Sequence, residues 1–193
     1  MTKKIIISIS ILLNISLILV IFLNKDKSIF VSTNKIQREY QKTDFGEKIY
    51  TETEFGNTNN PKYQKTIVNS EIFTEYSYFE DGSVKEETHY KNGLKHGYCI
   101  LYHPNTNINK STRYENGEIK EIIKYYNNGN IKELSVAESD KIRLITTYYK
   151  NGFIESEGKM ILSKNGNRTF YDRWIWYNSD VTLKKEKVFR KNM

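Results

Sequence analysis

The chain has 193 residues, which suits one domain with an appendage, and it carries 15 tyrosines but only 2 prolines. This composition argues against intrinsic disorder and favours an amphipathic β-sheet. The formal net charge is +7, yet acids and bases alternate along the chain, as in Lys85-Glu86-Glu87 and Lys132-Glu133. A nucleic-acid binder usually gathers its bases on one stripe, so we expect a solvated sheet face and no nucleic-acid partner.

Residues 1–27 contain an apolar run that is long enough to cross a bilayer. Ile5 to Leu23 holds no charge over 19 residues, and a helix rising about 1.5 Å per residue would span roughly 30 Å. We predict an uncleaved signal anchor that holds the protein in the inner membrane with the remainder exported. A cleaved signal peptide, which would give a secreted or periplasmic protein, stays open, although no small-residue cleavage site follows the run.

The next two segments lead into the main domain. Residues 28–43 are polar and predict a linker, with a short helix at Ile36–Gln41. Residues 44–77 predict strands, because Lys48 to Thr53 alternates imperfectly between apolar and polar side chains. Residues 56–61 have the composition of a loop. We interpret 44–77 as N-terminal cap strands, since the terminal units of a repeat array are usually atypical.

Residues 78–193 form a repeat array. A tyrosine recurs at Tyr78, Tyr102, Tyr125 and Tyr148, in steps of 24, 23 and 23 residues. A turn residue follows four positions later, at Gly82, Thr106, Gly129 and Gly152, and a branched aliphatic follows six positions later, at Val84, Ile108, Ile131 and Ile154. A fixed period of this length indicates a repeat protein. A degraded fifth copy is predicted at Tyr177, with Leu183 and Phe189 in the aliphatic and aromatic positions.

The turns inside each copy are those of β-hairpins. Asn-Gly or Asp-Gly pairs occur at 81–82, 92–93, 116–117, 128–129, 151–152 and 165–166. These pairs favour type I′ turns, which need φ > 0 at both central residues. The third copy has Ser139-Asp140 where an Asn-Gly pair is expected. Each copy therefore predicts two strands and two turns, and the fold class is all-β, an open meander of successive hairpins.

The array resembles the MORN-repeat family in its bacterial variant form, often catalogued as YwqK-type predicted antitoxins of toxin–antitoxin modules. The resemblance rests on residues 78–86 (YFEDGSVKE), 90–98 (YKNGLKHGY), 125–133 (YYNNGNIKE) and 148–155. It covers roughly residues 78–190. It implies hairpin repeats and an antitoxin or immunity-type protein that neutralises a partner protein, such as a toxin, by binding it.

The segment 170–177 is the densest aromatic run of the chain. In a strand, Trp174 and Trp176 share one face, while Tyr171, Arg173, Ile175 and Tyr177 share the other. Both faces are then apolar or aromatic, and only one is needed for packing on the array. Trp174, Trp176, Tyr171 and Arg173 are therefore our candidate partner contacts.

Catalytic and metal chemistry finds little support in the residue pattern. His89, His96, His103 and Cys99 lack the paired spacing of zinc ligands, and nothing beside Cys99 indicates an activated thiolate. The acidic residues recur at repeat positions, as Glu86 and Glu133 do, which favours a scaffold role. We therefore expect no cofactor, no metal and no enzymatic activity.

The expected function is non-enzymatic binding of another protein at the cell envelope. Two alternatives stay open. One is a membrane-associated scaffold that binds lipid or envelope components, since MORN repeats are linked to membranes. The other is a small envelope enzyme. We also predict that the repeat tyrosines are largely buried as a ladder of aromatic side chains across neighbouring strands.

Overall fold

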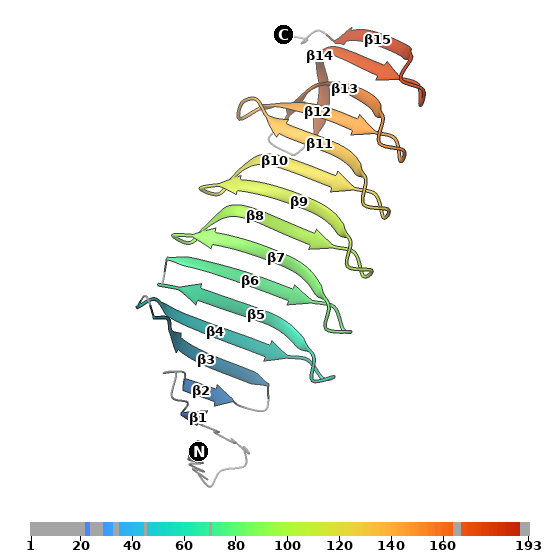
Figure 1. The fold of residues 1–193 in the computed structure, drawn as a ribbon. Helices are drawn as coiled ribbons and strands as arrows, with labels where there is room; N and C mark the ends of the chain where they lie inside the picture. Colours follow the sequence, from blue (N-terminus) through green and yellow to red (C-terminus); the bar gives the residue numbers. More distant parts are fainter. Residues whose placement is uncertain are drawn as a thin grey trace. The chain divides into compact units, whose positions relative to one another are not determined.

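The computed structural model describes residues 22–23, 29–32, 35–44, 46–69, 71–163 and 167–189. These residues form two compact units that divide after Leu94. Within each unit the strands follow one another in a single antiparallel layer, and the described residues contain no helix (Figure 1). The expected all-β meander is therefore confirmed within each unit.

The first unit is a meander in which each strand pairs with the next. Its strands are β1 (Phe22–Leu23), β2 (Ile29–Ser32), β3 (Ile36–Lys42), β4 (Lys48–Phe55), β5 (Pro61–Val68), β6 (Ile72–Tyr78) and β7 (Val84–Lys91).

The second unit repeats the same arrangement. Its strands are β8 (Leu94–Tyr102), β9 (Ile108–Glu115), β10 (Glu118–Tyr125), β11 (Ile131–Ala137), β12 (Ile142–Tyr148), β13 (Ile154–Leu162), β14 (Arg168–Tyr177) and β15 (Leu183–Phe189). Every consecutive pair in it is antiparallel.

One five-residue turn recurs at the repeat position. The N–H of its first residue donates to the carbonyl of its fifth at 2.8 Å, in the segments 56–60, 79–83, 103–107, 126–130, 149–153 and 178–182. The fourth residue always has a positive φ, and these residues are Asn59, Gly82, Thr106, Gly129, Gly152 and Val181. This is the three-residue hairpin loop in which a type I turn is followed by a left-handed residue.

The type I′ prediction is therefore correct for only some of the turns. Asn92 and Gly93 have φ of 51° and 76°, and Asn116 and Gly117 have 49° and 85°, as type I′ requires. At the repeat turns, only the fourth residue is left-handed. The Ser139-Asp140 turn differs from both kinds, because the N–H groups of Glu138 and Ser139 donate to the carbonyl of Ile142 at 2.9 and 3.1 Å.

The repeat register confirms the copies expected from the sequence. Each repeat tyrosine lies opposite the aliphatic residue six positions later, and a register shift directly precedes that pair. The predicted fifth copy obeys the same rule, with Tyr177 opposite Leu183. Phe55 lies opposite Pro61 in the same way, so the repeat already begins inside the segment that we interpreted as a cap.

The helix predicted at Ile36–Gln41 is wrong, because these residues belong to strand β3. Tyr40 lies opposite Tyr50 and Arg38 opposite Glu52. The Tyr rings are 4.9 Å apart, and the Arg38–Glu52 ion pair measures 2.6 Å. Cross-strand pairs of this kind stabilise a strand, and they outweigh a weak local helix pattern.

Most of the predicted anchor, residues 5–21, lies outside the described residues. Phe22–Leu23, which we expected to end the helix, form β1 and pair with β2. Among the residues that the structure describes, no helix has the length and apolar character needed to cross a membrane.

The repeat tyrosines are less buried than predicted. Tyr78, Tyr102, Tyr125 and Tyr148 are all half-buried, as expected where a single layer of strands has no second layer to cover it. In the second unit, five of the buried residues instead form a row across one face, made by Cys99, Thr112, Ser135, Ile145 and Trp174. Small side chains dominate the row, because neighbouring strands bring them close together.

Candidate protein-binding surface

The two tryptophans that we proposed as partner contacts differ in solvent exposure. Both point to the same face of β14, as predicted, but Trp174 is only 1% exposed while Trp176 is half-buried. The Trp174 ring lies over Gly158 of β13, and its indole N–H donates to the carbonyl of Lys159 at 2.6 Å. Trp174 is therefore a core residue of the second unit, and only Trp176 remains accessible.

The two tryptophans pack with two phenylalanines on the same face. Phe170 lies edge-on to Trp174 at 4.7 Å between ring centroids and stacks with Phe189 at 5.0 Å. Trp176 lies 5.8 Å from Trp174 and 6.4 Å from Phe189. We call this set, Phe170, Trp174, Trp176 and Phe189, the aromatic cluster, and the sheet face that carries it the aromatic face. Edge-to-face and offset pairs of this kind each stabilise by about 0.5–1.5 kcal/mol.

The opposite face of β14 carries Arg173 and Tyr177, as predicted. Arg173 donates to both carboxylate oxygens of Glu186 at 2.7 and 3.1 Å. This hydrogen bonding raises the pKa of Arg173 and lowers that of Glu186. The Tyr177 hydroxyl donates to Glu157 at 2.7 Å, which together with burial raises its pKa. Tyr171 is half-buried and lies opposite Lys159.

A shallow groove of about 340 Å³ runs across this opposite face. Leu144 and Ile175 provide apolar walls, while Glu157, Lys159 and Arg173 provide charge. Asp172 also lines the groove and has φ of 58°, an uncommon conformation for a residue with a side chain. Lys159 is held by an ion pair with Glu138 at 2.7 Å, so most charges beside the groove are already paired within the unit.

Exposed apolar side chains concentrate near β15 on this same face. Leu183 is 61% exposed and Val188 is 58% exposed, and Val181 in the preceding turn is 54% exposed. The aliphatic residues in the corresponding repeat position, Val84, Ile108, Ile131 and Ile154, are all half-buried. Leu183 thus occupies a position that is covered in the other copies but uncovered here.

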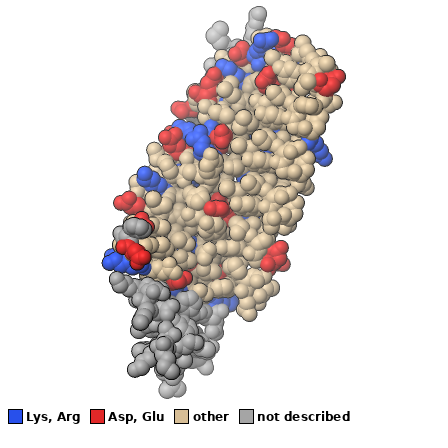
Figure 2. All heavy atoms as spheres, viewed as in Figure 1, with Lys and Arg blue, Asp and Glu red and all other residues tan. Residues whose placement is uncertain are grey.

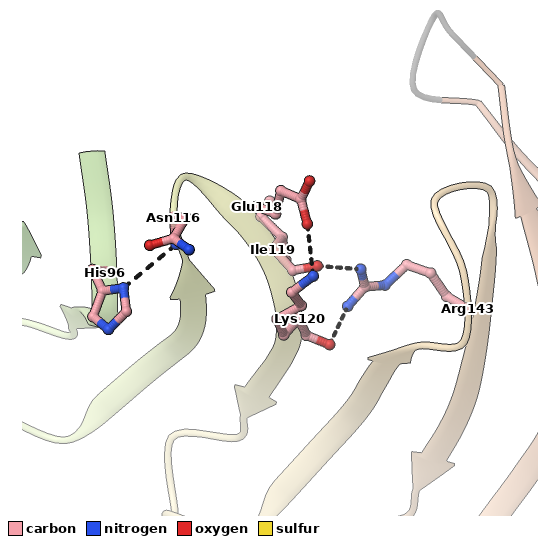
Figure 3. A network of polar contacts seen from close by, with 6 residues as sticks. All are labelled: His96, Asn116, Glu118, Ile119, Lys120 and Arg143. Atoms are coloured by element: carbon pink, nitrogen blue, oxygen red, sulfur yellow. Dashed lines mark hydrogen bonds and ion pairs between the residues drawn. The ribbon is translucent and has the colours of Figure 1, made fainter. Parts of the chain in front are cut away.

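The buried Arg143 is a structural residue that our sequence reasoning missed. It is 5% exposed, and its Nε donates to the Ser135 hydroxyl at 2.6 Å. Its Nη atoms reach the carbonyls of Ile119 and Lys120 at 3.2 and 3.4 Å, which connects β12 to β10 (Figure 3). Burial lowers the pKa of the guanidinium. No motif marks this role, because it depends on the placement of β10 and β12 on either side of β11.

The repeat turns are joined by asparagine side chains, which the sequence also did not reveal. The Asn107 amide donates to the carbonyl of Asn127 at 2.9 Å, and the Asn130 amide donates to that of Lys150 at 2.8 Å. Asn60 makes the same contact to Glu80 in the first unit, at 2.8 Å. The spacing of 20 residues in each case is the only signal that could have predicted these contacts.

Charge in the first unit is arranged in pairs across strands. Arg38 contacts Glu52 at 2.6 Å and Lys65 contacts Glu75 at 3.6 Å, and all four lie in one row of facing residues. Hydrogen bonds from Tyr50 and Arg38 lower the pKa of Glu52. In Figure 2, basic and acidic side chains of the described residues are likewise interspersed over the visible face. Opposite charges that face each other across strands in this way stabilise the sheet.

The histidines and the cysteine lie apart from the β14–β15 hairpin. Cys99 is buried, and His96 accepts a hydrogen bond from the N–H of Asn116 at 3.4 Å (Figure 3). His89 contacts Glu87 at 3.0 Å in the first unit, and His103 lies in a repeat turn. Within the described part of the chain, no group of three or more His, Cys, Asp or Glu side chains is placed to hold a metal ion.

Comparison of the chain with protein-family models and with curated proteins finds no match.

Proposed function

We propose that the chain is a non-enzymatic repeat protein that binds another protein through the β14–β15 hairpin of its second unit. The observation that carries this proposal is the exposure of Leu183, at 61%, in a position that is half-buried in the other copies. Val188 extends the apolar surface along the same face, opposite Arg173 in the sheet register. Exposed apolar patches on soluble domains mark interaction sites.

The energetics favour a partner at this site. Burial of an exposed leucine or valine side chain is favourable by roughly 1.5–3 kcal/mol. Burial of Leu183 and Val188 by a partner would therefore contribute a few kcal/mol to the free energy of association. Terminal units of repeat arrays usually present a polar outer face. In the described residues β15 also exposes Leu183 and Val188 beside its charged side chains, and burial of these two by a partner would account for them.

The resemblance of the repeats to MORN-type variants supports a narrower form of the proposal. In this form the protein acts as an antitoxin or immunity-type protein and neutralises a toxin by binding it. The uncharged run Ile5–Leu23 supports a membrane-anchored location, with the repeat units on the exported side. Binding would then take place at the cell envelope.

A capture experiment tests the binding surface. The full-length chain, carrying an affinity tag, is crosslinked in its native cells and purified as wild type and as Leu183→Asp/Val188→Asp. Phe153→Asp serves as the matched control, because Phe153 is 49% exposed in a turn of the same unit. We expect one protein to be recovered in stoichiometric amount with wild type and control but not with the double variant.

The protein that is recovered then tests the narrower form. Expressed alone, it should arrest growth, and co-expression of the wild-type chain should relieve the arrest while the double variant should not. Equal recovery of the same protein by wild type and double variant would contradict the proposed surface. A recovered partner with no toxicity would contradict the antitoxin role but leave the binding role intact.

A further inference from the structure

We propose that the outer edge of β15 binds an extended, acidic segment of a partner protein by strand addition. This inference rests on the proposed function and names the chemistry of the partner. Among the described residues β14 is the only strand that pairs with β15, along Asp172–Phe189 to Tyr177–Leu183. The other edge of a strand paired on one side presents N–H and C=O groups to a further strand.

The charge on β15 determines which segment fits. Lys184, Lys185 and Lys187 are all exposed, and none of them forms an ion pair with a described carboxylate. The one acid of the strand, Glu186, is held by Arg173 through two hydrogen bonds at 2.7 and 3.1 Å. Among the described residues, the charge of these three lysines is therefore not balanced by an acid.

Elsewhere in the sheet, cations meet acids across neighbouring strands. Lys124 of β10 contacts Glu133 of β11 at 3.0 Å, and in the first unit Lys65 of β5 contacts Glu75 of β6 at 3.6 Å. Opposite charges that face each other across strands stabilise a sheet, and like charges destabilise it. By the same rule, a strand added beside β15 should carry acids opposite Lys185 and Lys187.

The geometry also gives the spacing of those acids. Lys185 and Lys187 are two residues apart and lie on the aromatic face, with their Nζ atoms 5.4 Å from the Trp176 ring centroid and 4.8 Å from that of Phe189. Leu183 and Val188 lie on the other face, opposite Tyr177 and Arg173. Since side chains alternate in a strand, the segment that fits has acidic residues at every second position and apolar residues between them.

A second copy of the chain does not meet this requirement. Pairing β15 with β15 would bring the lysines of both strands together, and like charges on neighbouring strands repel. Lysines on an edge strand are a known protection against such self-association. The lysines of β15 therefore disfavour pairing with a second copy and favour pairing with an acidic segment.

Peptide binding to the full-length chain in a mild non-ionic detergent tests the inference. The probe is a short fluorescein-labelled peptide in which glutamate alternates with valine. One comparison peptide has lysine in place of glutamate. Another keeps the glutamate–valine sequence but is N-methylated at alternate backbone nitrogens, which removes the ability to pair with a strand edge while keeping charge and side chains. We expect only the first peptide to bind and to slow amide exchange in residues 183–189.

Charge reversal on the protein locates the site. Lys185→Glu/Lys187→Glu should weaken binding by at least about tenfold, because two attractive cross-strand pairs become repulsive. Lys141→Glu/Lys150→Glu makes the same change in net charge at exposed positions of the same unit and should leave affinity within about twofold. Equal binding of the N-methylated peptide, or no loss with the Lys185/Lys187 variant, would overturn strand addition.

These outcomes are separable from those of the proposed function. If the peptide does not bind but Leu183→Asp/Val188→Asp still loses its protein partner, strand addition is wrong and protein binding through this hairpin stands. If the peptide binds as described, the inference holds whatever protein is captured from cells.

Discussion

Replacing Gly158 with alanine should destabilise the second unit through a single steric contact. Gly158 lies beneath the indole of Trp174, and a Cβ built at this position would be 2.4 Å from Cδ2 of the ring. Ordinary contacts of a Cβ lie at 3.4–4 Å. The indole must therefore move by about 1 Å, but it is 1% exposed and its N–H is bonded to the carbonyl of Lys159 at 2.6 Å.

The magnitude follows from three contributions. Overpacking of a filled site costs about 1–3 kcal/mol, and loss of the Trp174 hydrogen bond costs a further ~0.5–1.5 kcal/mol. Alanine offsets about 0.4–1 kcal/mol of this, because it has less conformational freedom than glycine in the unfolded chain. The expected net loss is about 2–3 kcal/mol, which lowers the melting temperature of a unit of this size by ~10–20 °C.

Urea and thermal unfolding, followed by tryptophan fluorescence and circular dichroism, measure this loss. Both tryptophans lie in the second unit, so the fluorescence reports on that unit alone. Gly56→Ala is the control and is followed by circular dichroism, since Gly56 lies in the first unit. Its φ is not positive, and the added Cβ would make an ordinary contact at 3.6 Å. Trp174→Phe in the same chain should recover part of the loss caused by Gly158→Ala. An unchanged transition for Gly158→Ala, or strict additivity of the two substitutions, would refute the contact.

Three further outcomes are expected. Gly129→Val should cost about 1–3 kcal/mol in thermal unfolding because φ is 87° at Gly129, whereas Thr106→Gly should be neutral or mildly stabilising; equal melting of Gly129→Val and wild type would contradict the turn. Glu52 has a folded pKa below its ordinary 4.5, owing to hydrogen bonds from Tyr50 and Arg38. Its stabilising effect, ~1 kcal/mol or less at this exposure, is therefore present above pH 4.5 and is lost as pH falls through the folded pKa. Glu52→Gln should lower the free energy of unfolding at pH 7 and match wild type in strong acid, and a difference that persists there would exclude the ion pair as its source. Arg143→Met should cost about 2–4 kcal/mol in urea unfolding, since it removes the donor to the Ser135 hydroxyl and to the carbonyls of Ser135, Ile119 and Lys120; a loss below about 0.5 kcal/mol would show that water replaces the guanidinium.

The sequence by itself determined the order of strands and turns in this protein. Strand and turn formation depend on short-range chemistry, and the 23-residue recurrence of tyrosine, turn residue and aliphatic residue repeats that chemistry several times. The register of Tyr177 opposite Leu183 could be predicted from the earlier copies for this reason. The shared face of Trp174 and Trp176 also followed directly, because side chains alternate along a strand.

The tertiary structure alone decided what the local pattern leaves open. Asn-Gly pairs are compatible with two kinds of hairpin turn, and the register of the flanking strands selects between them. Residues 36–41 become a strand because Glu52 and Tyr50 lie across from them, which no local window can show. The burial of Trp174, the exposure of Leu183 and the position of Arg143 beneath the carbonyls of β10 all depend on which residues from distant strands come together. Proximity of this kind is set by the stacking and curvature of the strands, so it appears only once the strands are assembled.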